Sequence, residues 1–158
     1  MADIKPCNIL LIDGFSLLYR AYYGYPPNLT TPSGTPINAV YGFVTLMLNA
    51  IKEFNPTYFG ICLDRKEPTY RHTMFPAYKA HRSAPDDEFL VQLPEFKKVL
   101  APFNVPLIEL PGYESDDLLG VLSKRFSKEG LVTYIMSGDL DLLQLVDDHI
   151  VLATNKKG

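Results

Sequence analysis

The chain has 158 residues, of which 47% are hydrophobic and 21% are charged, and it carries a formal net charge of −3. This composition predicts one soluble domain with a sizeable core, and no apolar run approaches the roughly 20 residues that a membrane-spanning helix needs. We expect a cytoplasmic protein, because the N-terminus has no signal-like segment and the two cysteines lack the neighbours of a disulfide framework or zinc site.

Four apolar runs rich in β-branched and aromatic residues predict buried strands. Each run leads directly to acidic residues. In chain order they are residues 8–12 before Asp13, residues 58–63 before Asp64, residues 105–110 before the segment 111–117, and residues 132–136 before the segment 137–141.

Helical patterns separate these runs. Apolar residues recur at helical spacing over 38–54 and stop before Pro56. A second helix is predicted from Asp86 or Asp87 to Leu100, with a kink or late start at Pro94. A third is predicted with Ser115 as its N-cap, ending before Gly130. Residues 25–36 hold four prolines and predict a surface connection, which we interpret as a plain long loop rather than a functional wall.

Alternation of strands and helices predicts an α/β domain whose mainly parallel sheet is covered on both faces. Ligands of such sheets bind beyond the carboxyl ends of the strands, so the acidic residues are expected to converge there. Any one of them could equally cap a helix or sit in a turn. Seven carboxylates at one edge instead favour a hard divalent cation, magnesium or manganese rather than zinc. They are Asp13, Asp64, Glu114, Asp116, Asp117, Asp139 and Asp141.

The stretch 65–82 is basic and aromatic. It holds five Lys or Arg against the single Glu67, and Tyr70, Phe75 and Tyr78 lie between them. Basic groups and stacking rings together suit a single-stranded nucleic acid, although a solvated loop with buried aromatic anchors would show the same pattern. Lys79 and Arg82 are three residues apart, which would place them on one face of a helical turn. Because the stretch begins at Asp64, we expect a lid or arch over the acidic edge.

Several motifs together resemble the 5′-nuclease (flap endonuclease) family. They are IDGFSLLYRAYY at 12–23, the strand before Asp64, FPAYKAHR at 75–82, GYESDDLLG at 112–120 and SGDLDLLQLV at 137–146. The chain is most similar to the N-terminal 5′ to 3′ exonuclease domain of bacterial DNA polymerase I. The likeness runs in order along nearly the whole chain.

This resemblance implies a PIN-like (resolvase-like) fold over residues 1–158, with a helical arch at about 65–87. It implies a metal-dependent nuclease of replication or repair that cuts DNA at 5′ ends and 5′ flaps, with RNA primer strands as further substrates. Two Mg²⁺ or Mn²⁺ ions are implied for the full-length protein. The residues matched to the first ion are Asp13, Asp64, Glu114, Asp116 and Asp117; those matched to the second are Asp139 and Asp141. Lys79 and Arg82 match catalytic residues that steer the phosphate, Tyr78 matches a base-stacking aromatic, and Arg20 and Arg71 are further nucleic-acid contacts.

Relatives in this family complete the second ion with a downstream acidic pair and grip duplex DNA with a helix-hairpin-helix element, and this chain contains neither. We therefore expect metal binding by this chain and efficient cleavage by a longer protein. The alternative is a catalytically incomplete nucleic-acid-binding module. An aspartyl phosphoacceptor domain is disfavoured, because Asp13 is followed by Gly14 and Phe15 rather than by a second aspartate two residues later.

Overall fold

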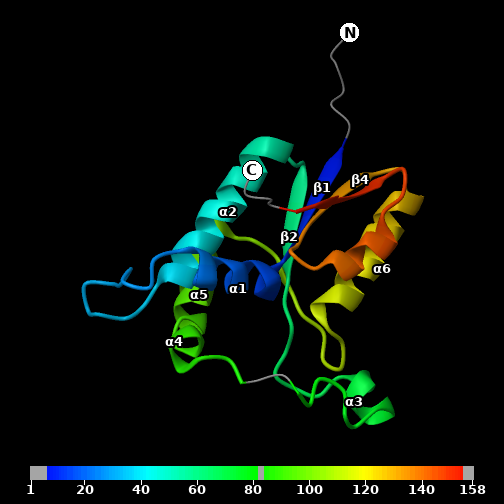
Figure 1. Cartoon of the computed structure of the whole chain (residues 1–158). Coiled ribbons are helices and arrows are strands. Elements are labelled where there is room, and N and C mark those ends of the chain that lie inside the picture. Colours follow the sequence, from blue (N-terminus) through cyan, green and yellow to red (C-terminus); the bar gives the residue numbers. More distant parts are fainter. Residues whose placement is uncertain (1–6, 82–83, 155–158) are drawn as a thin grey trace.

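The computed structural model describes residues 7–81 and 84–154 as a five-stranded sheet flanked by helices (Figure 1). The elements, in chain order, are β1 (Asn8–Asp13), α1 (Gly14–Gly24), α2 (Asn38–Phe54), β2 (Tyr58–Cys62), α3 (Tyr70–Met74), α4 (Asp87–Leu90), α5 (Leu93–Leu100), the 3₁₀ helix η1 (Ala101–Phe103), β3 (Leu107–Ile108), α6 (Ser115–Lys128), β4 (Val132–Met136), the 3₁₀ helix η2 (Leu140–Leu145) and β5 (Ile150–Ala153).

The sheet places β1 at its centre, in the order β3-β2-β1-β4-β5, and every pair of neighbouring strands is parallel. Asp13 lies opposite Cys62 of β2, and Ile12 lies opposite Met136 of β4. The carboxyl ends of β1, β2 and β4 therefore meet at one edge. The predicted α/β domain is confirmed, and its sheet is wholly parallel among the described strands.

Both faces of the sheet are covered, as predicted. Successive side chains of a strand point to opposite faces, so Leu10 and Ile12 pack under α1, α2 and α5, while Ile9 and Leu11 pack against α6 and η2. Figure 1 shows α1 and α2 on one side of the sheet and α6 on the other. Two apolar layers thus fix the central strand that ends in Asp13.

The junction of β1 and α1 depends on Gly14. A Cβ atom here would overlap the Leu63 side chain and lie 3.0 Å from the Cys62 carbonyl oxygen. Such close approach of α1 to the end of β2 requires glycine. It keeps Asp13 beside the residues that follow β2.

Most predicted elements form within a residue or two of their expected bounds. α2 covers 38–54, and the helix expected over 86–100 is split into α4 and α5 next to Pro94. Residues 25–36 are irregular apart from one bridge between Thr30 and Pro36. None of the described helices has both the length and the apolarity needed to cross a bilayer.

Three predictions need correction. Ser115 is the first residue of α6 rather than its N-cap, which is Glu114. The strand β5 was not expected, because its four residues lie between polar segments. Residues 76–81 form turns, with Lys79 in the left-handed region at φ 56°, so Lys79 is not on the predicted helical turn. Its proposed neighbour Arg82 lies outside the described residues.

Candidate metal centre

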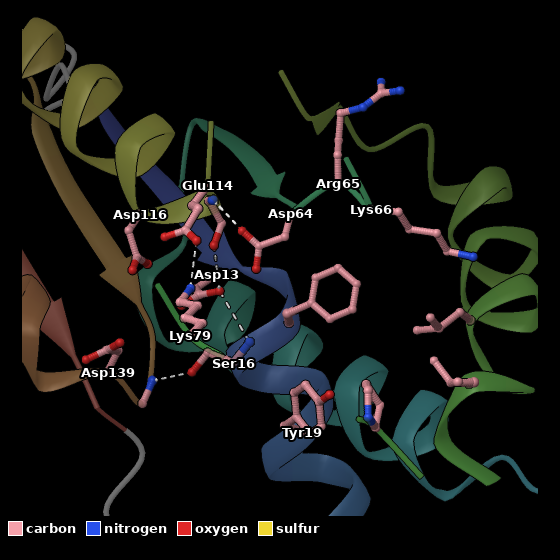
Figure 2. Close-up of a pocket in the computed structure, with 16 residues that line it drawn as sticks. Asp13, Ser16, Tyr19, Asp64, Arg65, Lys66, Lys79, Glu114, Asp116 and Asp139 are labelled. Atoms are coloured by element: carbon pink, nitrogen blue, oxygen red, sulfur yellow. Dashed lines mark hydrogen bonds and ion pairs between the residues drawn. The ribbon is translucent and has the colours of Figure 1, made fainter. Parts of the chain in front are cut away.

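A cavity of about 630 Å³ opens at the carboxyl edge of the sheet (Figure 2). Basic side chains of Arg65, Lys66 and Lys79 lie on its wall. The carboxylates that line it come from four separate places in the fold: Asp13, Asp64, Glu114, Asp116 and Asp139. Five of the seven predicted acidic residues are therefore brought together, although they span more than a hundred positions of the chain.

Asp13 is the most deeply held of these carboxylates, with a residue exposure of 4%. Its Oδ1 accepts the Ser16 backbone N–H at 3.2 Å and so caps α1, and its Oδ2 accepts the Ser137 hydroxyl at 2.7 Å. Burial raises the pKa of Asp13, helped by repulsion from Asp64 and Asp139 and opposed by the two hydrogen bonds. The two hydrogen bonds thus fix the orientation of the Asp13 side chain, while burial and the neighbouring acids make its ionised form less favourable.

Asp64 lies after β2 and accepts a hydrogen bond from the N-terminus of α6. Its Oδ1 accepts the Ser115 backbone N–H, the first of α6, at 2.6 Å. A helix N-terminus stabilises a carboxylate through its unpaired N–H groups and its dipole. The contact joins the end of β2 to the beginning of α6.

Asp116 lies in the first turn of α6 and faces the other acids across the cavity (Figure 2). Its pKa is raised to about 6 by burial and by repulsion from Asp13, Asp139 and Asp64, against a smaller effect of Lys79. Among the described residues, no group donates a hydrogen bond to its side chain. Its charge is therefore the least compensated in the cavity.

Glu114 differs from the other carboxylates of the cavity because side chains of residues 78 and 79 already bind it. Lys79 Nζ lies 2.8 Å from Oε1, and the Tyr78 hydroxyl donates to Oε2 at 2.9 Å. Burial alone would raise the pKa of Glu114, but these contacts outweigh it and hold the pKa below its usual value. Tyr78 and Lys79 thus reach the acidic edge of the sheet.

Of the remaining predicted residues, Asp117, Asp141 and Arg20 do not line the cavity. Asp117 pairs with Arg71, at 2.7 Å for each of two hydrogen bonds. Asp139 lines the cavity and accepts the Asp141 backbone N–H at 2.9 Å, whereas Asp141 itself is exposed. Arg20 is half-buried on α1 and is not among the residues that line the cavity.

Ser137 was not predicted to take part in the site, and the structure places it in contact with both Asp13 and Asp139. Besides donating to Asp13, its hydroxyl accepts the Asp139 backbone N–H at 3.0 Å, and the residue is 1% exposed. Ser16 Oγ similarly accepts the Gly138 N–H at 2.9 Å. A serine directly after a buried strand is the only sequence signal for this role, and many plain turns share it.

The donor set fits a hard divalent cation by its chemistry, because every candidate ligand is a carboxylate, and burial together with mutual repulsion raises the pKa of two of them. Within 7–81 and 84–154, however, no three such side chains are yet close enough to form a ready-made chelating group. The residues that would hold a first ion are Asp13, Asp64 and Asp116, joined by Glu114 once its carboxylate leaves Lys79, and Asp139 would hold a second ion. Binding must therefore include side-chain rearrangement.

Comparison with known proteins gives a consistent result. A family model described as the 5′-3′ exonuclease, N-terminal resolvase-like domain matches residues 8–158. The chain is 39% identical over 144 residues to DNA polymerase I of Caldicellulosiruptor bescii, covering 91% of this chain and 17% of that protein. It is 38% identical to the 5′-3′ exonucleases of Aquifex aeolicus and Bacillus subtilis, covering 91% and 95% of this chain and 50% and 51% of those proteins. The chain thus spans about half the length of those exonucleases and a much smaller part of the polymerase.

Solved structures support the same fold. A bacteriophage T5 5′-exonuclease with bound zinc ions matches with a TM-score of 0.69 and 18% identity, covering 94% of this chain and 55% of that one. A bacteriophage T5 flap endonuclease in a pseudo-enzyme-product complex with DNA and metal ions matches with a TM-score of 0.68, the same identity and the same coverage.

Proposed function

Because the chain belongs to the family of 5′-3′ exonuclease N-terminal resolvase-like domains, we propose that it supplies the acidic cleavage centre of a divalent-metal-dependent nuclease. The reaction is hydrolysis of phosphodiester bonds in DNA from 5′ ends and at 5′ flaps. One observation carries this proposal: Asp13, Asp64 and Asp116 meet at the carboxyl edge of the sheet in a cavity that Lys79 also lines. Mg²⁺ is the proposed ion, with Mn²⁺ as a substitute.

In this proposal the ions are held by the four cavity carboxylates that make no ion pair with a Lys or Arg side chain of the described residues: Asp13, Asp64, Asp116 and Asp139. Asp13 is oriented by Ser137 and Ser16, and Asp64 by the N-terminus of α6, so two of the four are already fixed. When bound, divalent ions supply a water of lowered pKa and neutralise charge that develops on the phosphate. Asp139 is assigned to the second ion in this proposal, and the Asp141 backbone N–H, which donates to Asp139 Oδ1, orients it.

The basic residues orient the substrate. Lys79, Arg65 and Lys66 line the same cavity as the carboxylates, so a phosphate can be held between the two charge types. Lys79 can exchange Glu114 for a phosphate oxygen, and the Tyr78 ring beside it offers a stacking surface for a base. No side chain is required as a nucleophile, since the Ser16 and Ser137 hydroxyls are engaged in holding the site.

The wider setting belongs to the same proposal. The segment 65–87 is the arch over the cavity, DNA with 5′ ends or flaps is the principal partner, and RNA primer strands are further substrates. We place the protein in the cytoplasm, in DNA replication or repair. The share of the relatives that this chain matches supports a role as one part of a larger nuclease.

Cleavage of a 5′-labelled flap DNA tests the proposal directly. The chain is incubated with Mg²⁺, with Mn²⁺ or with EDTA, beside Asp13→Asn, in which the amide oxygen retains the α1 cap while the charge is lost. Product that requires metal and Asp13 supports the nuclease. Metal-independent product, or equal turnover by Asp13→Asn, contradicts it.

A nucleic-acid-binding module without turnover is the second candidate function. It is favoured by the contact of Lys79 with Glu114 and by the lack of a ready-made chelating group within the described ranges. Metal-dependent retention of flap DNA in a mobility-shift assay, with no product at any metal concentration, would favour it over the nuclease.

A further inference from the structure

Asp116 and Asp117 are neighbours in the first turn of α6, yet their side chains lie in different environments. Consecutive residues of a helix point about 100° apart. Asp116 lines the acidic cavity, whereas Asp117 is absent from its lining. The two adjacent acids are therefore expected to have different roles.

Both carboxylate oxygens of Asp117 accept hydrogen bonds from Arg71 and from the backbone at the start of α6. Arg71 Nη1 donates to Oδ2 and Arg71 Nη2 donates to Oδ1, both at 2.7 Å. Oδ2 also accepts the Glu114 backbone N–H at 3.0 Å, completing the capping box of α6. The two oxygens of Asp117 thus accept three hydrogen bonds, and the side chain is held outside the lining of the cavity.

The Arg71 guanidinium is likewise engaged in contacts with the carboxylates of α6 and its N-cap. It belongs to α3, which lies 46 positions before Asp117 in the chain, and its Nη1 is also 3.5 Å from Glu114 Oε2. Two further contacts dock α3 beside the start of α6: the Tyr70 N–H donates to the Gly112 carbonyl at 3.0 Å, and the Tyr70 ring meets the Tyr113 ring. Arg71 is thus the charged part of a continuous junction.

We propose that Arg71 and Asp117 are positioning residues that anchor the base of the arch to the N-terminus of α6. This role replaces the predicted ones of Asp117 as a metal ligand and of Arg71 as a nucleic-acid contact. The fork of an arginine matches a carboxylate at two points and so fixes orientation as well as distance. The junction sets where Tyr78 and Lys79 meet Glu114, which gives the pair its influence on the cavity.

The inference rests on the proposed nuclease function only for its effect on turnover. Its first test is Mn²⁺ binding followed by electron paramagnetic resonance, with Asp117→Asn and the matched neighbour Asp116→Asn. Asp117→Asn should keep the Mn²⁺ dissociation constant within about threefold, while Asp116→Asn should weaken binding at least about tenfold. Equal losses in both variants overturn the positioning role.

Amide hydrogen exchange tests the anchor without any metal or substrate. Arg71→Met and Asp117→Asn should each accelerate exchange of the Tyr70 and Phe75 amides, by about tenfold, and the double variant should be no faster than either single one, because both remove the same contact. Asp116→Asn should leave these amides unchanged. Additive effects, or no effect, overturn the anchor even where the wild-type chain binds no Mn²⁺.

Turnover separates positioning from general structural damage. Asp117→Asn should lower kcat/KM for flap DNA mainly through a higher KM, and Arg71→Lys, which keeps the charge but not the fork, should recover part of the loss relative to Arg71→Met. A pure loss of kcat in Asp117→Asn would point instead to a ligand role. If no variant and no wild-type chain cleaves, the nuclease proposal fails while the exchange experiment still decides the role of the pair.

Discussion

The Ser137 hydroxyl donates a 2.7 Å hydrogen bond to Asp13 Oδ2, although 124 positions separate the two residues. The same hydroxyl accepts the Asp139 backbone N–H at 3.0 Å. One buried side chain therefore links Asp13, the last residue of β1, to Asp139 in the loop after β4. This link sets the relative placement of carboxylates assigned to the first and the second ion.

Ser137→Ala should weaken Mn²⁺ binding by about tenfold, because a group that orients a metal ligand typically contributes that much. It should also lower the free energy of unfolding by about 1–3 kcal/mol, since a buried carboxylate loses its donor. Calorimetric titration and urea unfolding measure the two effects. Ser33→Ala in the exposed loop is the control and should change neither. An unaltered Mn²⁺ affinity in Ser137→Ala would show that Asp13 does not need this contact.

Asp116→Asn should raise the thermal stability of the metal-free protein. The Asp116 carboxylate is partly buried, faces Asp13, Asp139 and Asp64, and has its pKa raised to about 6. Removing the charge relieves repulsion worth about 1 kcal/mol after allowance for solvent screening. Such a gain at the expense of function is common at active sites.

Mn²⁺ should then reverse the order of stability. A ligand that binds only the folded state stabilises it by about 2.7 kcal/mol at one hundred times its dissociation constant. Wild-type protein should therefore gain more in Tm than Asp116→Asn when Mn²⁺ is added in a thermal scan. Equal Tm increases in both would contradict a ligand role for Asp116.

The fold was largely predictable because its signals are local. Runs of β-branched residues mark β1, β2 and β4, and helical spacing marks α2, since each pattern spans enough residues to exclude the alternative. β5 escaped prediction because four apolar residues between polar segments fit a loop equally well. The helical turn expected at Lys79 was wrong, because the spacing between two cations carries no information about the backbone, and Lys79 adopts a positive φ.

The site was predictable in position but not in detail. Strand ends locate the acids, and the parallel topology brings five of them into one cavity. The sequence does not distinguish Asp116 from Asp117. The difference arises because Asp117 pairs with Arg71 of α3 and does not line the cavity. Ser137 was missed for the same reason: its role depends on a contact between β1 and β4 that only the folded chain makes.

Asp147 provides a pH-dependent test away from the cavity. Hydrogen bonding from Lys124, with further bonds from the His149 and Ile150 N–H groups, holds the pKa of Asp147 below its usual value of 3.8. A pKa that is lower in the folded state contributes stability above pH 3.8, and that contribution is lost as pH falls through the folded value. Carboxyl-carbon NMR should therefore show a midpoint below 3.8. Lys124→Met should move it upward, and a midpoint unaffected by that change would contradict the assignment.

Lys79→Ala should weaken DNA binding without weakening Mn²⁺ binding. Lys79 Nζ lies 2.8 Å from Glu114 Oε1 in the structure, so its removal frees this one carboxylate oxygen and should leave Mn²⁺ affinity equal to or above that of wild type. Flap-DNA binding should weaken, and the slope of log K against log salt should become shallower by about 1, because one fewer phosphate charge is neutralised. Fluorescence anisotropy over a salt series measures the slope. Lys98→Ala, whose side chain is exposed on α5 beside Glu95, is the matched control and should keep the wild-type slope. A Lys79→Ala slope equal to wild type would remove Lys79 from the substrate contacts and leave it as a partner of Glu114 alone.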